Sequence, residues 1–393
     1  MISQLQVQHF KALRDVTVDL EPFTVLIGPN DSGKSSFLEA LYALSESAWR
    51  QTAECFWSEW SSTELVYNHN KDGEVFFGAL LGQQSPKEYG LLLRFVHNVF
   101  CRVVHESLNQ EKVTGDNDRY SIISGHSKPA SDQLERYLDD ILDIRDQLPP
   151  PAFVKWNLED LATPSRLPSE RPYPIDPLGY GLATCIAEMK LDEISMYAKL
   201  VDSFRAIFPE FRDFRIKRKP AKSIERDKKK RKFIGTEGEG YALSLVREDG
   251  VDIPANMAAG GTLITLAFLT LTHLREPKKL LLVEEPENGL HPSRLGEIIE
   301  VLRKAVQSQP DAQVVMTTHS PLLLNYVEPQ EVRVFLRNKD KDNDVEVYNL
   351  ADVPDMKDRL KYMMLGELVH NEGEEELIKE IQHAHLDSGR RAD

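Results

Sequence analysis

The pattern Gly28-x4-Gly33-Lys34-Ser35 constrains this 393-residue chain more than any other feature. It follows Phe23–Ile27, a stretch that is apolar on both faces, and it precedes the helical apolar spacing of residues 37–44. A strand that is apolar on both faces belongs inside a sheet that helices cover. The order of strand, glycine loop and helix therefore predicts an α/β fold.

This loop also contains the groups that a triphosphate needs. Its glycines let the backbone curl so that successive N–H groups point inward, and the helix that follows presents its positive dipole end. We expect Lys34 to bridge the β- and γ-phosphates of ATP and the Ser35 hydroxyl to bind Mg²⁺. An unliganded glycine turn would explain the glycines but not a lysine at the helix start. The predicted nucleotide-binding residues are Gly28, Pro29, Asn30, Asp31, Ser32, Gly33, Lys34, Ser35 and Ser36.

A buried strand is also expected at residues 279–283, and the acids Glu284 and Glu285 follow it. Acids at the end of such a strand lie at the carboxyl edge of a parallel sheet, where open α/β folds bind ligands. We expect Glu284 to orient Mg²⁺ through water and Glu285 to orient or deprotonate the water that attacks the γ-phosphate. Alone, this pattern is also that of a solvated strand end, so the interpretation depends on its pairing with the glycine loop.

A third predicted strand, Gln313–Thr317, is followed by Thr318 and His319. A histidine at this position can donate a hydrogen bond to the γ-phosphate and so report its presence; the alternative is a structural histidine with its own partners. The predicted catalytic residues are Lys34, Glu285 and His319, and the predicted metal ligands are Ser35 and Glu284.

Composition excludes several classes of protein. No apolar run approaches the ~20 residues of a membrane span, and the first residues do not resemble a signal peptide, so we expect a cytoplasmic protein without membrane contact. Cys55, Cys101 and Cys185 lie far apart without any CxxC, which argues against a disulfide framework or a cysteine zinc site.

Charge is distributed unevenly along the chain. The net charge is −15, yet residues 212–232 hold twelve Lys or Arg against three acids, an excess of +9. Any DNA or RNA would have to bind here, through residues 217–232, which include Lys217, Arg218, Lys219 and Lys232. A solvated hairpin without a ligand explains the run equally well, and both interpretations stay open.

Taken together, the three motifs resemble the ATP-binding-cassette (ABC) class of P-loop ATPases, in the branch that contains RecF and SMC heads. Phe10-Lys11 and Gly28-Pro29-Asn30 are similar to that branch. The run from Glu284 through His291-Pro292, followed by Thr317-Thr318-His319-Ser320-Pro321, resembles the ATPase domain of the OLD family and its stand-alone bacterial relatives. The resemblance implies a P-loop NTPase of the ABC-ATPase head type, with a mixed sheet flanked by helices and a helical insertion.

The resemblance also implies how the chain is divided and how the site is completed. We expect residues 1–104 and 236–393 to form the head and residues 105–235 to form a largely helical insertion. Each nucleotide would lie between the phosphate loop of one subunit and a signature helix of another, in a homodimer or higher oligomer. The candidate signature residues are Ala259, Gly260, Gly261 and Thr262, with alanine where the family usually has serine, which implies weaker pairing or slow hydrolysis.

The family's nuclease members have a C-terminal Toprim module, and the segment after His319 is too short to contain one. We therefore expect an ATPase switch without nuclease activity of its own, which controls a separate nuclease or toxin in anti-phage defence or DNA maintenance. The alternatives are a nucleic-acid-binding scaffold in which ATP is a structural ligand, and a transporter subunit, against which the RecF-like opening argues.

Overall fold

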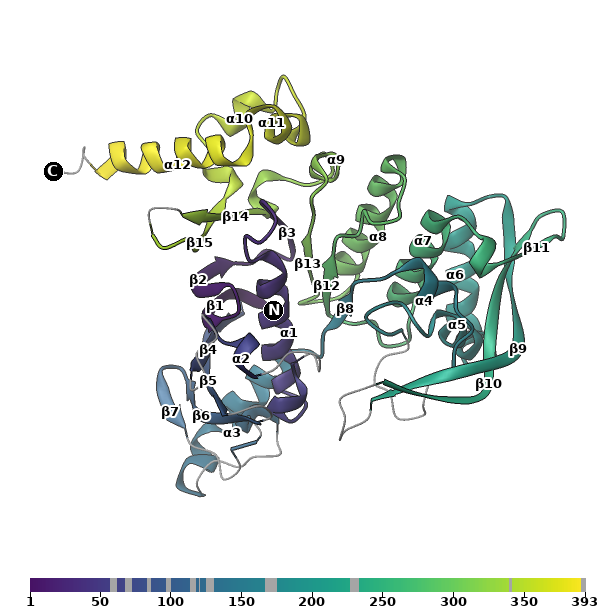
Figure 1. Cartoon of the computed structure of the whole chain (residues 1–393), viewed down its shortest axis with the longest axis horizontal. Helices are drawn as coiled ribbons and strands as arrows, with labels where there is room; N and C mark the ends of the chain where they lie inside the picture. The colour runs from purple at the N-terminus through teal and green to yellow at the C-terminus, as the bar shows by residue number, and fades with distance from the viewer. Residues whose placement is uncertain are drawn as a thin grey trace. The chain divides into compact units, whose positions relative to one another are not determined.

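The computed structural model describes residues 1–56, 62–67, 73–82, 86–96, 100–113, 118–119, 121–124, 131–166, 175–226, 233–338 and 341–389. These residues form two compact units (Figure 1). Unit 1 combines both ends of the chain, Met1–Pro151 and Pro310–Asp393, and unit 2 is the continuous segment Ala152–Gln309. The sequence-based division at residues 104/105 and 235/236 stays a prediction.

One sheet of unit 1 is antiparallel throughout. Along β4, every second side chain is buried, beginning at Val75. This alternation is typical of a sheet with one face on the core and one toward water. The strands, in spatial order, are β2 (Leu13–Asp19), β1 (Ile2–Phe10), β4 (Glu74–Leu81), β5 (Lys87–Val96), β6 (Phe100–Leu108) and β7 (Glu111–Val113).

The other strands of unit 1 surround β3 (Phe23–Ile27), in which all five residues are buried, as the apolar sequence predicts. Strands β13 (Gln313–Thr317) and β14 (Val332–Asn338) each pair with it in parallel, and β15 (Asp344–Asn349) pairs antiparallel with β14. Helix α1 (Lys34–Ser47) packs against this sheet, where the Phe37 and Phe335 rings meet edge to face with centroids 5.6 Å apart. Because β3 and β13 are parallel neighbours, the loops that follow them emerge at the same edge.

Further helices complete unit 1. Helix α11 (Leu365–Glu372) packs on α9 (Pro321–Leu324), and the Gly366 N–H donates to the Asn325 side-chain oxygen at 2.8 Å. Arg359 at the end of α10 binds Glu372 of α11 at 2.7 Å and Glu380 of α12 at 2.5 Å. The remaining helices here are α2 (Ser62–Leu65), α3 (Ser131–Gln147), α10 (Met356–Arg359) and α12 (Glu374–Gly389).

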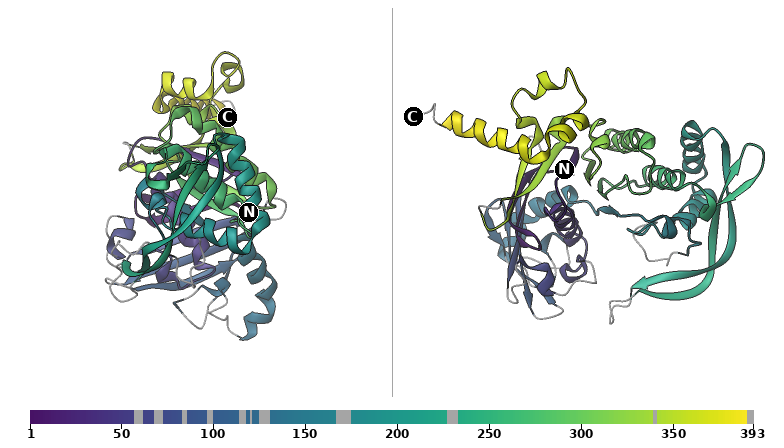
Figure 2. Two further views of the ribbon diagram at one scale, coloured as in Figure 1. Left: turned by 90° about the vertical axis from the view of Figure 1, so that its right-hand side faces the viewer. Right: turned by 45° about the horizontal axis from the view of Figure 1, so that its top comes forward.

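Unit 2 contains a pair of parallel strands with nearby helices, and a long antiparallel hairpin. Strand β8 (Ala152–Val154) runs parallel to β12 (Leu280–Glu284), near helices α4 (Leu158–Ala162), α7 (Gly260–Thr272) and α8 (Leu295–Ser308). A long antiparallel hairpin of β9 (Phe211–Arg226) and β10 (Phe233–Arg247), edged by β11 (Asp252–Pro254), extends beside α5 (Leu182–Asp192) and α6 (Ile194–Ile207) (Figures 1 and 2).

The predicted α/β class is confirmed, with a mixed arrangement of parallel and antiparallel strands flanked by helices. Among the described residues, no helix combines the length and the apolar character that crossing a bilayer requires.

The close contact of α11 with α9 gives a stability prediction. In Gly366→Ala the new Cβ would lie 1.9 Å from the Pro321 carbonyl oxygen, so the helices must separate. We expect a loss of about 2 kcal/mol in the free energy of unfolding, measured by urea denaturation. Gly261→Ala is the control, because Gly261 is also the second residue of a helix but has ordinary contacts. It should change stability by less than about 1 kcal/mol; equal effects of the two substitutions would contradict the packing argument.

Candidate functional site

The phosphate loop, residues 28–36, lies between β3 and α1 in unit 1. Gly28 and Gly33 have φ angles of 137° and 98°, a region that favours glycine. A Cβ on Gly28 would lie 2.1 Å from the Phe335 carbonyl oxygen, and one on Gly33 would lie 2.8 Å from Leu13 Cδ2. Both glycines are therefore required by backbone conformation and by close neighbours, and the curled loop that the sequence predicts is present.

Lys34 is the first residue of α1 and is 5% exposed. Its ammonium donates to the carbonyl oxygens of Gly28 at 2.7 Å and Pro29 at 2.8 Å. The Ser32 hydroxyl lies 3.4 Å from the same nitrogen. The loop thus curls around a buried positive charge, which an anion bound to the loop amides would meet.

His319 belongs to the same edge of the sheet. It follows β13, and the Thr318 N–H extends the parallel pairing by donating to Leu26 O at 3.1 Å. The Thr318 hydroxyl accepts from the Ser320 N–H at 3.0 Å, which fixes the turn around His319. His319 is exposed beside the loop that follows β3. The structure therefore brings the predicted residues of unit 1 together at one edge.

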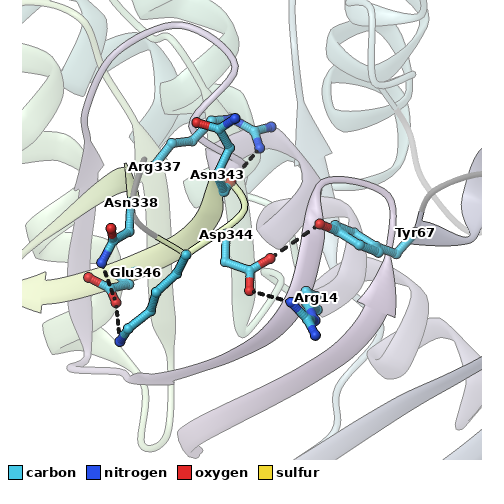
Figure 3. Close-up of polar contacts among 8 residues, drawn as sticks. Arg14, Tyr67, Arg337, Asn338, Asn343, Asp344 and Glu346 are labelled. Atoms are coloured by element: carbon cyan, nitrogen blue, oxygen red, sulfur yellow. Dashed lines mark hydrogen bonds and ion pairs between the residues drawn. The ribbon is translucent and has the colours of Figure 1, made fainter.

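Arg337 supports the phosphate loop from β14, a role that the sequence motifs did not indicate. Its Nε donates to the Asp31 carbonyl oxygen at 2.7 Å. Another guanidinium nitrogen donates to the Asn343 carbonyl oxygen at 2.9 Å, as Figure 3 shows. Asp31 has a φ of 62°, an uncommon conformation for a residue with a side chain. The guanidinium thereby stabilises a strained part of the loop.

The hairpin of β14 and β15 also contacts β2, and side chains of its two strands contact each other. The Asp344 carboxylate binds Arg14 at 2.9 Å and accepts from the Tyr67 hydroxyl at 3.2 Å (Figure 3). The Glu346 carboxylate accepts from both Asn338 and Lys341. The described residues of the tip, with the Asp344 N–H donating to Lys341 O at 2.8 Å, form a hydrogen-bonded turn.

The predicted acids lie in unit 2, where β12 ends. Glu284 is the last residue of the strand, and its side chain, 9% exposed, pairs with Lys155 at 3.0 Å. Glu285 has a φ of 49°, and its carboxylate accepts from the Asn288 side-chain nitrogen at 2.7 Å. A positive φ at a residue with a side chain costs energy and is common at functional sites. The two carboxylates therefore have different partners.

The candidate signature segment lies next to these acids in unit 2. Helix α7 begins at Gly260, and the preceding Ala259 is exposed and caps no amide with its side chain. A Cβ on Gly260 would lie 2.6 Å from Leu158 Cδ1 and 3.2 Å from the Gly289 carbonyl oxygen. The turn after Glu285 thus packs on the first turn of α7, whose free amides and dipole suit an anion.

A phosphate loop with these glycines and this lysine, between a buried strand and a helix, defines a P-loop ATPase. A family model described as "AAA domain, putative AbiEii toxin, Type IV TA system" matches residues 109–325, and one described as "AAA ATPase domain" matches residues 1–120. The chain belongs to the first of these AAA-domain families, whose model spans more than half of it.

Individual proteins share part of the sequence or the fold. The OLD nuclease of Thermus scotoductus is 37% identical over 49 residues, which are 12% of this chain and 9% of that protein. An SMC head bound to the C-winged helix domain of ScpA has a similar fold, with a TM-score of 0.50, 14% identity and coverage of 88% of this chain and 97% of that chain. An SMC head from Thermotoga maritima gives a TM-score of 0.44 at 12% identity, over 88% of this chain and 98% of its own.

The contact of Arg337 with the phosphate loop can be tested by substitution. In Arg337→Gln, Asp31 loses its guanidinium partner, and we expect MgATP to bind about fivefold to tenfold more weakly, the equivalent of one hydrogen bond of about 1 kcal/mol. Isothermal titration calorimetry measures the affinity. The control is Lys341→Gln, which removes one positive charge from the same hairpin. Lys341 pairs with Glu346 and not with the phosphate loop, so this variant should bind MgATP like the wild type. Equal affinities for all three proteins would show that Arg337 does not support the loop.

Proposed function

We propose that this protein is an ATP-driven molecular switch, which closes two heads when ATP binds and opens them when ATP is hydrolysed. The observation that carries the proposal is the phosphate loop, with its two obligatory glycines around buried Lys34. Membership of an AAA-domain family agrees with ATP as the ligand. A glycine turn alone would not require a buried lysine at the start of α1.

In the proposed site, different residues bind the phosphates, activate the attacking water and hold the metal ion. Loop amides and Lys34 hold the β- and γ-phosphates, and His319 donates to the γ-phosphate. Glu285, held by Asn288, orients the attacking water and accepts its proton. Carboxylate and hydroxyl oxygens suit Mg²⁺, so Ser35 and Glu284 would hold this ion, which neutralises charge on the phosphates. In the described residues no group of three His, Cys, Asp or Glu forms a metal cage, and Mg²⁺ in such sites typically uses one or two protein ligands beside the phosphates.

We also propose that a second copy of the chain completes each site with its signature segment. Support comes from the exposed start of α7, where Ala259 and the amides of Gly260 and Gly261 are presented without a capping side chain. Alanine at position 259 provides no hydroxyl for the γ-phosphate. We therefore expect ATP-driven pairing to be weaker, or turnover slower, than with serine at this position.

The switch would act on a separate nuclease or toxin in bacterial anti-phage defence or DNA maintenance, in the cytoplasm. The names of the matched family and of the OLD nuclease support this setting. In this proposal cleavage of nucleic acid belongs to the partner; the match to the OLD nuclease covers 9% of that protein.

Two substitutions test the ATPase proposal. Glu285→Gln should lower phosphate release at least about a hundredfold, because the attacking water loses its base, and should trap an ATP-bound dimer detectable by light scattering after gel filtration. Lys34→Ala should abolish MgATP binding. Glu300→Gln, which removes an exposed carboxylate on α8, is the control and should behave like the wild type. Unaltered turnover in the first two variants would contradict the proposal.

A second candidate function is nucleic-acid binding by β9. Arg212, Arg215, Lys217, Arg218 and Lys219 are exposed on this strand. Asp252 pairs with Arg215 at 2.5 Å and Lys217 at 3.4 Å, so part of this charge is already neutralised. The predicted residues 227–232, Lys228 to Lys232 among them, lie outside the described residues.

This candidate is separated from the first by its salt dependence. Replacing Lys217, Arg218 and Lys219 together with Gln should weaken binding of a labelled DNA duplex about tenfold at low salt and reduce the slope of affinity against salt concentration. Fluorescence anisotropy measures both. Replacing Lys304, Lys357 and Lys361 gives a charge-matched control. Absence of binding at low salt, or equal loss in both triple variants, would rule out a specific role for β9.

A further inference from the structure

A lysine that follows β8 contacts the acid that the proposed function assigns to Mg²⁺. Val154 of β8 pairs in parallel with Val283 of β12, so the next residues of the two chains, Lys155 and Glu284, lie side by side. The Lys155 ammonium is 3.0 Å from Glu284 Oε2. Because parallel strands end at the same edge of a sheet, the register of β8 and β12 brings this lysine to this acid.

The two partners of this ion pair differ in burial. The Glu284 side chain is 9% exposed, whereas that of Lys155 is 57% exposed. A carboxylate that has lost most of its water depends on a nearby cation. An ammonium at the end of a flexible four-carbon stem, already more than half exposed, can return to water at low cost. The pair therefore stabilises the carboxylate more than it stabilises the lysine.

The backbone around Lys155 is fixed, so that only its side chain has to move if Glu284 is released. The Lys155 N–H donates to the Pro177 carbonyl oxygen at 2.8 Å. The Trp156 ring packs on Phe268 of α7, with ring centroids 4.7 Å apart. Rotation of exposed side-chain bonds takes nanoseconds or less and requires no rearrangement of the sheet.

The pair is suited to exchange between two cations. An ammonium has positive charge and N–H donors, and Mg²⁺ with the waters that it usually keeps has positive charge and O–H donors. Both would act on the same carboxylate of Glu284. Lys34, by contrast, is 5% exposed and donates to two loop carbonyl oxygens, so it has no comparable access to water.

A structural link between β8 and β12 is the alternative role of this ion pair. The two strands already pair along Ala152–Val154, and all three residues of β8 are buried. The strands are therefore held together by backbone pairing and burial without the ion pair. Its place at the acid assigned to Mg²⁺ favours a role in charge control.

We propose that Lys155 is a positioning residue that acts through Glu284: it neutralises this carboxylate before MgATP binds, and its side chain turns into water when the carboxylate serves MgATP. This inference rests on the proposed role of Glu284. An approaching triphosphate would then meet a neutral pair and not an uncompensated carboxylate. Lys155 would thereby determine how strongly ATP binding depends on Mg²⁺.

The first test measures ATP binding by calorimetry in Mg²⁺ and in EDTA, and takes the ratio of the two affinities as the metal enhancement. In Lys155→Gln this ratio should rise about fivefold, because Glu284 repels ATP without Mg²⁺ and has no competing ammonium with it. Lys155→Met, which keeps an aliphatic stem, should behave in the same way. Lys155→Arg, which keeps the charge, should show the wild-type ratio or a lower one.

The matched control is Lys279→Gln. Lys279 is exposed and directly precedes β12, so it lies at the opposite end of this strand from Glu284. The variant loses the same charge as Lys155→Gln and should keep the wild-type metal enhancement. An equal rise in both variants would show that net charge, and not the pair with Glu284, sets the ratio, and would overturn the inference.

Urea denaturation tests whether the two side chains act on each other. Lys155→Gln removes the partner of a buried carboxylate and should lower the denaturation midpoint. Adding Glu284→Gln to this variant should restore part of the loss, because the uncompensated charge is then gone. Losses that simply add in the double variant would mean that the pair is not coupled, and would overturn the inference.

Further outcomes separate this inference from the proposed function. A metal enhancement that is equal or smaller in Lys155→Gln and Lys155→Met, when Glu284→Gln lowers it, overturns the inference alone. An unchanged enhancement in Glu284→Gln overturns both the metal role of Glu284 and the inference. Binding of MgATP by Lys34→Ala as tight as by the wild type overturns the proposed function itself.

Discussion

The central constraint on this protein is the small space available to the backbone where the buried parallel strand β3 ends and the phosphate loop begins. Gly28 can turn at the end of β3 because its hydrogen takes the place of a Cβ that would meet the Phe335 carbonyl oxygen. The parallel neighbours β13 and β14 then determine what stands beside the loop: His319 on one side and Arg337 on the other. The positions of these groups follow from strand order, which is why a buried five-residue strand controls the chemistry of unit 1.

Local patterns allowed the strands and helix next to the motifs to be predicted from the sequence. The apolar stretches Phe23–Ile27 and Gln313–Thr317 are the observed strands, residue for residue, because full burial leaves a continuous hydrophobic signal. The expected strand at residues 279–283 is β12, shifted by one residue. The basic run was harder to interpret, since Lys and Arg are uncommon in strands; cross-strand pairing with β10 makes most of it the regular strand β9.

One contact of the phosphate loop was not predictable from such patterns. The Arg337 Nε donates to the Asp31 carbonyl oxygen across 306 residues of chain. Arg337 stands in no recognisable motif, and single arginines near strand ends usually face water. The acidic start of α12 was visible in the sequence, but a charge pattern gives no information about which surface a helix docks on. Tertiary packing, by Leu377 and Ile378 among others, decides that.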